Sequence, residues 1–311
     1  MTVCIAAICQ EDGRQVVVGA SDRMVTIGDL QYEPKQLKLV PFNNGCVALV
    51  AGDHTQLTSI LRKTQRLLTA HPTESVTEIA ALVADCYVKL QQFYIERLAL
   101  AKFGLTYVKF LREARNLPPD VLREILAGIR EAELEAEFLV VGLDSTGQGQ
   151  LYKIQRGVPE PYDASGFAAI GWGERIAGAQ FMASDYSRHE SIAEALWLCY
   201  YAKRRAEAVP SVGARGTDLF TIRQDGGFKV IHPLTLNQTF AEAYDRVHEG
   251  EQRHHTEAVE KVEAWAREAF TPRQRGIARS AEASRGRSRS KRGSSDQPRL
   301  PESDESPEPV S

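Results

Sequence analysis

The first fifty residues of this chain constrain its fold most, because they contain four short strand-like segments in rapid succession. Residues 2–8 form an apolar run rich in β-branched side chains, and residues 16–20 form a second run after a glycine-containing turn. Residues 36–40 alternate between polar and apolar side chains, and residues 46–51 are apolar again. Short apolar or alternating runs separated by turn signals are typical of strands. The N-terminal segment therefore predicts a sheet built from hairpins.

Two charged residues, Asp22 and Lys38, lie in or beside these apolar segments. A charge that is removed from water costs free energy unless it is paired. A sheet built from hairpins can bring the two side chains together near the start of the chain, so we expect them to form an ion pair there. Lys35 is a second candidate for the lysine that pairs with Asp22. The simpler alternative for either lysine is an exposed position on a strand.

Thr2 follows Met1 directly. Methionine aminopeptidases remove an initiator methionine when the next side chain is small, and threonine meets that condition. The mature chain would then carry a hydroxyl and a free α-amine on one residue, and an α-amine with a pKa of about 8 is partly neutral at cellular pH. Such an amine can accept the proton of the hydroxyl, so nucleophile and base come from one residue. Many chains begin with Met-Thr and have no such activity.

The combination of these features is more specific than any one of them. Thr2, the Val-Val-Gly-Ala-Ser-Asp run that ends at Asp22, Thr26-Ile-Gly28, Lys38 and the Val-Ala-Gly run that ends at Gly52 resemble the pattern of proteasome β-subunits and bacterial HslV. These proteins are N-terminal nucleophile (Ntn) hydrolases. The spacing from Asp22 to Gly52 fits without gaps, and only the turn between the first two strands is longer here. The resemblance covers roughly residues 2–232.

The resemblance implies a role for each matching residue. Thr2 matches the nucleophile, Lys38 the lysine that lowers the proton affinity of the nucleophile, and Asp22 the carboxylate that orients this lysine. Gly52 matches the glycine whose N–H stabilises the oxyanion, a contribution of about 2.7–4 kcal/mol to a transition state. Three residues match positions at the substrate pocket of the family and imply an apolar preference: Val25, Thr26 and Val50.

Three positions depart from the family pattern. Asp53 replaces a small residue beside the oxyanion glycine, but it also forms a capping box with Gln56, which predicts a helix that begins there. Trp172, between two glycines, replaces a serine that lies close to the nucleophile in the family. A further aspartate of the family has no counterpart, since Glu207 is out of register. These departures affect the auxiliary hydrogen bonds but leave Thr2 and its partners in place.

The fold that the resemblance implies is α+β, a four-layer αββα sandwich over residues 1–234. A second capping box at residues 75–78 predicts another helix, and residues 97–135 are expected to form an inserted helical hairpin. Residues 235–270 predict a charged C-terminal helix with a break at Gly250, which would dock on its own domain or on a neighbouring subunit. Residues 271–311 are rich in Arg, Ser, Pro and Glu, a composition typical of disorder.

Composition narrows the functional class. The formal charge of −3 offers no electrostatic case for nucleic acid, and the basic run within the C-terminal tail is followed by an acidic end that neutralises it. Five cysteines without a CxxC pair predict reduced thiols in the cytoplasm. No apolar run approaches the ~20 residues that a membrane-spanning helix needs. The seven histidines show no metal-ligand spacing, so we expect neither a metal nor another cofactor.

The sequence therefore predicts a threonine peptidase that cleaves peptide bonds through Thr2. The resemblance implies peptide or unfolded-protein substrates, a homo-oligomeric ring and an unfoldase partner. Two alternatives stay open at this point. The chain can be an Ntn amidase that acts on a small non-peptide amide, or a non-catalytic structural subunit of a proteasome-like assembly, an alternative motivated by Trp172 and Asp53.

Overall fold

The computed structural model describes residues 2–27, 30–32, 38–210, 212–214 and 216–270. The described chain is mixed α and β, with two five-stranded sheets in which all neighbouring strands are antiparallel, and one short hairpin. Strands formed by sequential hairpins and helices that are segregated from them define the α+β class. This class is confirmed.

The first sheet has the N-terminal hairpin at its centre. In this hairpin, Cys4 lies opposite Ser21 and Glu11 lies opposite Arg14, as expected from two apolar runs joined by a tight turn. The order of strands is β10-β1-β2-β11-β12. The strands are β10 (Phe167–Ile170), β1 (Cys4–Glu11), β2 (Arg14–Asp22), β11 (Thr217–Arg223) and β12 (Gly227–Val230).

The second sheet has the order β5-β6-β7-β8-β9. The strand expected at residues 36–40 begins only at Leu39, so Lys38 directly precedes it, and residues 36 and 37 lie outside the described part of the chain. The strands are β5 (Leu39–Pro41), β6 (Cys46–Gly52), β7 (Ala136–Leu143), β8 (Gly149–Gln155) and β9 (Val158–Pro161). A separate hairpin contains β3 (Val25–Ile27) and β4 (Leu30–Tyr32).

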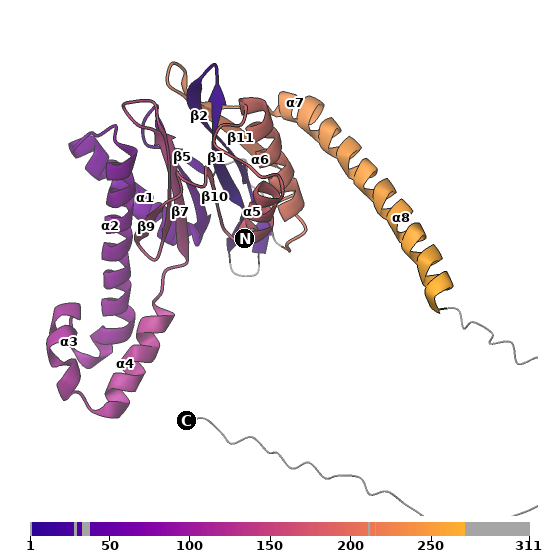
Figure 1. Ribbon diagram of the computed structural model, residues 1–311. Coiled ribbons are helices and arrows are strands. Elements are labelled where there is room, and N and C mark those ends of the chain that lie inside the picture. The colour runs from indigo at the N-terminus through magenta and orange to yellow at the C-terminus, as the bar shows by residue number, and fades with distance from the viewer. Residues whose placement is uncertain (1, 28–29, 33–37, 211, 215, 271–311) are drawn as a thin grey trace, which may run out of the picture. The chain divides into compact units, whose positions relative to one another are not determined.

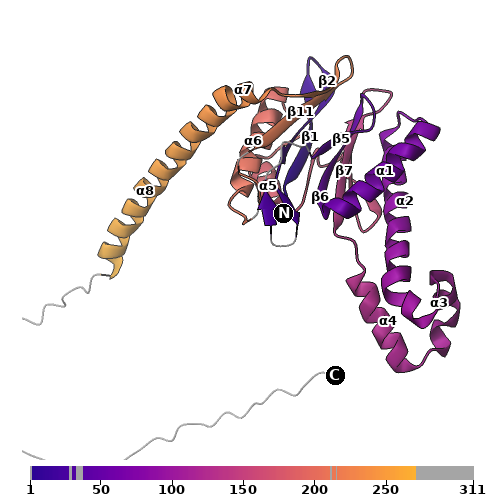
Figure 2. The ribbon, with the colours of Figure 1, turned by 180° about the vertical axis from the view of Figure 1, so that it is seen from behind.

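Alternating side chains of the two sheets fill three core clusters. Figures 1 and 2 show α1 (His54–Ala70) and α2 (Val76–Tyr94) beside the second sheet, and α5 (Glu174–Ala183) and α6 (Ile192–Ala206) beside the first. One cluster joins α5 and α6 to the first sheet and another joins α1 and α2 to the second. The third contains inward-facing residues from strands of both sheets, among them Cys4, Ile8 and Leu49.

Both predicted capping boxes begin helices at the expected residues. The Asp53 carboxylate accepts from the Gln56 N–H at 2.9 Å at the start of α1, and the Ser75 hydroxyl accepts from the Glu78 N–H at 3.3 Å at the start of α2. The Gln56 side chain does not reach back to Asp53. Its Oε1 accepts from the Glu135 N–H at 2.8 Å instead, and so fastens the chain that enters β7.

Helices also occupy the stretch in which the sequence predicts an inserted hairpin. A π-helical turn at Ile95–Leu100 extends α2, and α3 (Tyr107–Glu113) and α4 (Pro119–Glu131) follow it. Short 3₁₀ turns lie at Ala101–Phe103 and Ala114–Asn116. These helices surround a small core of their own that includes Leu100, Phe110 and Ile125.

The chain divides into two compact units, the first ending at Glu251 and the second beginning at Gln252. The first unit includes α7 (Pro233–Thr235), a π-helical turn at Leu236–Ala241 and the start of α8 (Glu242–Phe270). The predicted break at Gly250 is wrong, because α8 continues through it. A single glycine costs a helix only about 1 kcal/mol, which its neighbours readily offset. The predicted disorder of residues 271–311 falls outside the described part of the chain.

Candidate active site

Thr2 lies two residues before the start of β1, at the end of the first sheet where β1, β2 and β10 meet. The Thr2 side chain is almost fully buried, with 5% of its surface exposed. Along β1, Cys4, Ala6 and Ile8 point into the core between the sheets, and Thr2 continues this alternation. The side chain of the residue proposed as the nucleophile is therefore buried beside the sheet and not free in solvent.

Lys38 connects Thr2 to Asp22. Its ammonium donates to the Thr2 hydroxyl and, at 2.9 Å, to Oδ1 of Asp22. Asp22 is fully buried at the end of β2, and Lys38 is 9% exposed just before β5. The predicted ion pair is thus present, and it includes the Thr2 side chain. Lys35, the rival lysine, lies outside the described residues.

Asp22 accepts four hydrogen bonds from residues that the structure describes. Besides Lys38, its Oδ1 accepts from the backbone N–H of Val3 at 3.1 Å. Its Oδ2 accepts from the N–H of Met24 at 3.1 Å and from that of Gly213 at 2.9 Å. Hydrogen bonds from backbone N–H groups stabilise a carboxylate in its charged form. Asp22 therefore holds the Lys38 ammonium and also ties three backbone segments together.

Gly52 ends β6 in a conformation that requires glycine. Its φ is +118°, and a Cβ at this position would lie 2.0 Å from the carbonyl oxygen of Glu135. The next residue, Asp53, donates its N–H to the same carbonyl at 2.6 Å, and its carboxylate is used as the cap of α1. Asp53 thus has a structural role at this position, as its capping pattern predicts.

A turn between β10 and α5 packs against the backbone of Thr2. Gly173 donates its N–H to the Thr2 carbonyl at 3.2 Å. Gly171 has a φ of +86°, and a Cβ there would lie 2.3 Å from the same carbonyl and 3.3 Å from Cβ of Ala51. Thr2, the end of β6 and this turn therefore converge. Trp172, between the two glycines, is 69% exposed.

Glu137 is a site residue that the sequence reasoning missed. Its Oε2 accepts from the Gly171 N–H at 2.8 Å, and its Oε1 accepts from Nε2 of Gln155 at 3.1 Å. On the other side of the turn, Lys153 donates to Glu174 at 2.7 Å. Glu137 is a charge at the start of the apolar segment that forms β7. The reasoning that identified Asp22 could therefore have identified Glu137 from the sequence.

The three residues expected at a substrate pocket, Val25, Thr26 and Val50, have no described side-chain contact with Thr2, Lys38 or Asp22. The Val50 side chain packs in the core between the second sheet and α1 and α2, so it is not part of the Thr2–Lys38–Asp22 cluster. The Val50 carbonyl, however, accepts from Sγ of Cys4 at 3.5 Å. Val25 is half-buried in β3. Thr26 follows it in the same strand, and its side chain is outside the described ones.

Cys4 is the nearest rival nucleophile in the sequence, two residues from Thr2. Burial raises the pKa of its thiol strongly, an effect that the nearby positive charge of Lys38 opposes only in part. A thiol that stays protonated is a poor nucleophile. The ammonium of Lys38 is directed at the Thr2 hydroxyl, so the arrangement favours threonine over cysteine chemistry.

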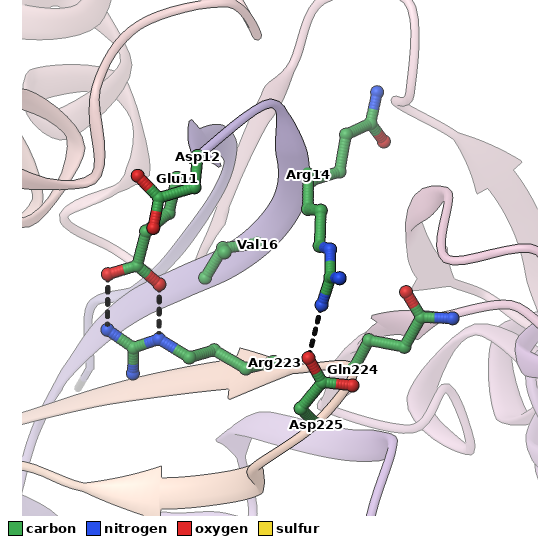
Figure 3. A pocket seen from close by; sticks show the side chains of 8 residues that line it. Glu11, Asp12, Arg14, Val16, Arg223, Gln224 and Asp225 are labelled. Atoms are coloured by element: carbon green, nitrogen blue, oxygen red, sulfur yellow. Dashed lines mark hydrogen bonds and ion pairs between the residues drawn. The ribbon is translucent and has the colours of Figure 1, made fainter.

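A pocket of about 350 Å³ lies at the opposite end of the β1–β2 hairpin from Thr2. Figure 3 shows that paired charges line it: Arg223 binds the Glu11 carboxylate with two hydrogen bonds, at 2.5 and 3.1 Å, and Arg14 binds Asp225. Most of the charged side chains that line this pocket are therefore hydrogen-bonded to one another. This pocket is therefore no part of the Thr2 site.

No group of His, Cys, Asp and Glu side chains within the described ranges is arranged to hold a metal ion. Across those ranges, none of the helices has the combination of length and hydrophobicity that crossing a bilayer requires. No known family model matches the chain, and no curated protein is significantly similar to it. The geometry around Thr2 is therefore the basis on which a function can be assigned.

Proposed function

We propose that this protein is an N-terminal threonine hydrolase that cleaves peptide amide bonds after Met1 has been removed. The observation that carries the proposal is the buried chain of contacts from Asp22 through Lys38 to the Thr2 hydroxyl. A buried ammonium has three N–H donors to satisfy, and here one of them is directed at the hydroxyl of the residue that becomes the N-terminus once Met1 is removed. An ammonium held against a hydroxyl lowers the free energy of the alkoxide that forms during attack.

In the proposed reaction, Oγ of Thr2 attacks the carbonyl carbon of the scissile amide while the α-amine of Thr2 accepts the hydroxyl proton. The resulting tetrahedral intermediate carries a negative oxygen, which the N–H of Gly52 would stabilise. Collapse breaks the C–N bond, and the amine product leaves with the proton. Water then hydrolyses the ester and regenerates Thr2.

The finer architecture is part of the same proposal. Cores between helices and sheet on two sides, and between the two sheets in the middle, support a four-layer αββα arrangement of the Ntn type. The resemblance of the sequence to proteasome β-subunits and HslV supports assembly into a homo-oligomeric ring, with an unfoldase that delivers unfolded protein substrates.

The proposal is tested by intact mass and by hydrolysis of fluorogenic peptide amides. We expect the purified protein to lack one methionine, Thr2→Ser to retain part of the activity and Thr2→Ala to lose it. Thr69→Ala, an exposed threonine on α1, is the matched control and should behave as wild type. A retained Met1 in the native protein would leave Thr2 without its amine and would favour the structural-subunit alternative.

A further inference from the structure

Trp172 is an exposed aromatic residue held directly beside the candidate nucleophile. Its two neighbours, Gly171 and Gly173, both approach the Thr2 carbonyl, while 69% of the Trp172 surface remains exposed. A tryptophan side chain offers 150–250 Å² of largely apolar surface. Such a surface is available to a ligand that binds beside Thr2.

The turn that carries Trp172 is fixed from three directions. Gly173 binds Thr2, Gly171 binds Glu137 on β7, and Glu174 binds Lys153 on β8. Cβ atoms at both glycines would clash, at 2.3 Å with the Thr2 carbonyl oxygen and at 2.8 Å with Val3. The backbone of residue 172 is thus anchored to both sheets and cannot move away from Thr2 without breaking these contacts.

The chemistry of the turn restricts what it can recognise. Glycines flank Trp172, so the indole is the one side chain that residues 171–173 present. The neighbouring charge of Glu174 is already neutralised by Lys153, which is itself 7% exposed. Recognition at this position therefore depends on a flat apolar surface and not on charge. Aromatic side chains are the natural partners of such a surface, through offset or edge-to-face packing.

We propose that Trp172 is a specificity-determining residue that packs against an aromatic side chain of the substrate next to the scissile amide. This inference rests on the proposed function, because the same site must bind and cleave the amide. It assigns a substrate class, peptides with an aromatic residue at the cleaved bond, which the Thr2–Lys38–Asp22 contacts by themselves do not specify.

The experiment compares two fluorogenic peptide amides that differ only in phenylalanine or alanine at the residue whose carbonyl is attacked. For wild type we expect a higher kcat/KM with the phenylalanine peptide. Trp172→Ala should lower that value about tenfold and leave the alanine peptide within about twofold, since one aromatic contact is worth about 0.5–1.5 kcal/mol in addition to its area burial. Trp172→Phe should keep most of the preference.

Trp265→Ala is the matched control, because Trp265 is 60% exposed on α8 in the other compact unit. It should leave both peptides unaffected. An unchanged phenylalanine-to-alanine ratio in Trp172→Ala, with the fold verified by thermal melting, would overturn the inference and leave the proposed function standing.

Binding of the uncleaved peptides to Thr2→Ala separates the two proposals further. Fluorescence titration should show tighter binding of the phenylalanine peptide, and this difference should disappear in the Thr2→Ala, Trp172→Ala double variant. If wild type cleaves neither peptide, the proposed function fails, and the titration still tests Trp172. If Thr2→Ala binds both peptides equally, Trp172 does not select aromatic residues.

Discussion

The two ends of the β1–β2 hairpin contain the same kinds of charged residues in opposite environments. At the Thr2 end, the side chains of Asp22 and Lys38 are 0% and 10% exposed. At the turn end, those of Arg14 and Asp225 are 65% and 77% exposed, and those of Arg223 and Glu11 about a third exposed. The ion pairs join the same kinds of side chains, but they differ in how much of each side chain is exposed to solvent.

The difference shows which pairs are expected to matter for function. An exposed ion pair contributes about 0–1 kcal/mol, since water and salt screen it. A buried pair costs desolvation free energy when it forms and about 3–5 kcal/mol when one partner is removed. A buried pair is therefore weak evidence for stability, and a charge that it positions can serve another purpose. At this site the positioned charge is the Lys38 ammonium against Thr2.

The largest expected effect comes from breaking the buried pair, and its two halves should behave differently. Lys38→Ala should abolish hydrolysis but cost less stability than Asp22→Ala. Without Lys38, Asp22 keeps three backbone N–H donors, whereas without Asp22 the buried lysine loses its carboxylate partner and the three N–H groups lose their acceptor. In urea unfolding we expect Asp22→Ala to lower the free energy of unfolding by about 3–5 kcal/mol.

Lys38→Arg sharpens this test. The planar guanidinium cannot occupy the place of a compact ammonium that donates to both Thr2 and Asp22, so activity should stay low. Wild-type turnover in Lys38→Ala would show that Lys38 is not the catalytic lysine. Equal stabilities of Lys38→Ala and Asp22→Ala would show that the backbone donors to Asp22 contribute little.

Glu137→Ala tests the contact between Glu137 and the turn beside Thr2 at the same end. Loss of a charged acceptor for the Gly171 N–H should cost about 1.5–3 kcal/mol and loosen the turn beside Thr2. We expect a fall in kcat and a change in tryptophan fluorescence that is absent when Trp172 is replaced by phenylalanine. Glu137→Gln keeps an acceptor oxygen and should retain more activity. Glu160→Ala, an exposed glutamate on β9, is the control and should leave both readouts unchanged.

Cysteine labelling tests whether the Thr2 end excludes thiol chemistry. All five cysteines are buried, and burial raises the pKa of Cys4, Cys46 and Cys199, and that of Cys9 to about 12. A thiol-specific reagent at pH 8 should therefore label no cysteine in the native protein and leave activity intact, while urea should expose all five. Inhibition that follows labelling of Cys4 would contradict the assignment of Thr2 as nucleophile.

The sequence could predict those parts of the molecule that depend on neighbouring residues. The hairpin of β1 and β2 and the caps at Asp53 and Ser75 follow from local periodicity and from side chains that reach a backbone N–H three residues away. The continuity of α8 through Gly250 was missed, because a single glycine weakens a helix without ending it.

The remaining site contacts could not be predicted, because they join segments far apart in sequence. Gly213 reaches Asp22 across 191 positions, and Gly171 reaches Glu137 across 34. Both donors are backbone N–H groups, which every non-proline residue has, so no side-chain pattern marks them. The pairing of Asp22 with Lys38 was predictable only because a charge in an apolar strand needs a partner.

The smallest effect is expected at the exposed end of the hairpin, with Glu11→Gln. The hydrogen bond with Arg223 holds the pKa of the Glu11 carboxyl below its usual 4.5. A carboxyl with a lowered pKa in the folded state stabilises the fold at pH values above its unfolded pKa, and this contribution disappears as the pH falls through the folded pKa. Because Glu11 and Arg223 are only partly buried, the difference between wild type and Glu11→Gln should be below about 1 kcal/mol at pH 7. Urea unfolding should show that difference unchanged down to about pH 5 and vanishing below the folded pKa, with hydrolysis unaffected throughout. A loss of several kcal/mol, or of activity, would show that the two ends of the hairpin are coupled and that burial alone does not separate them.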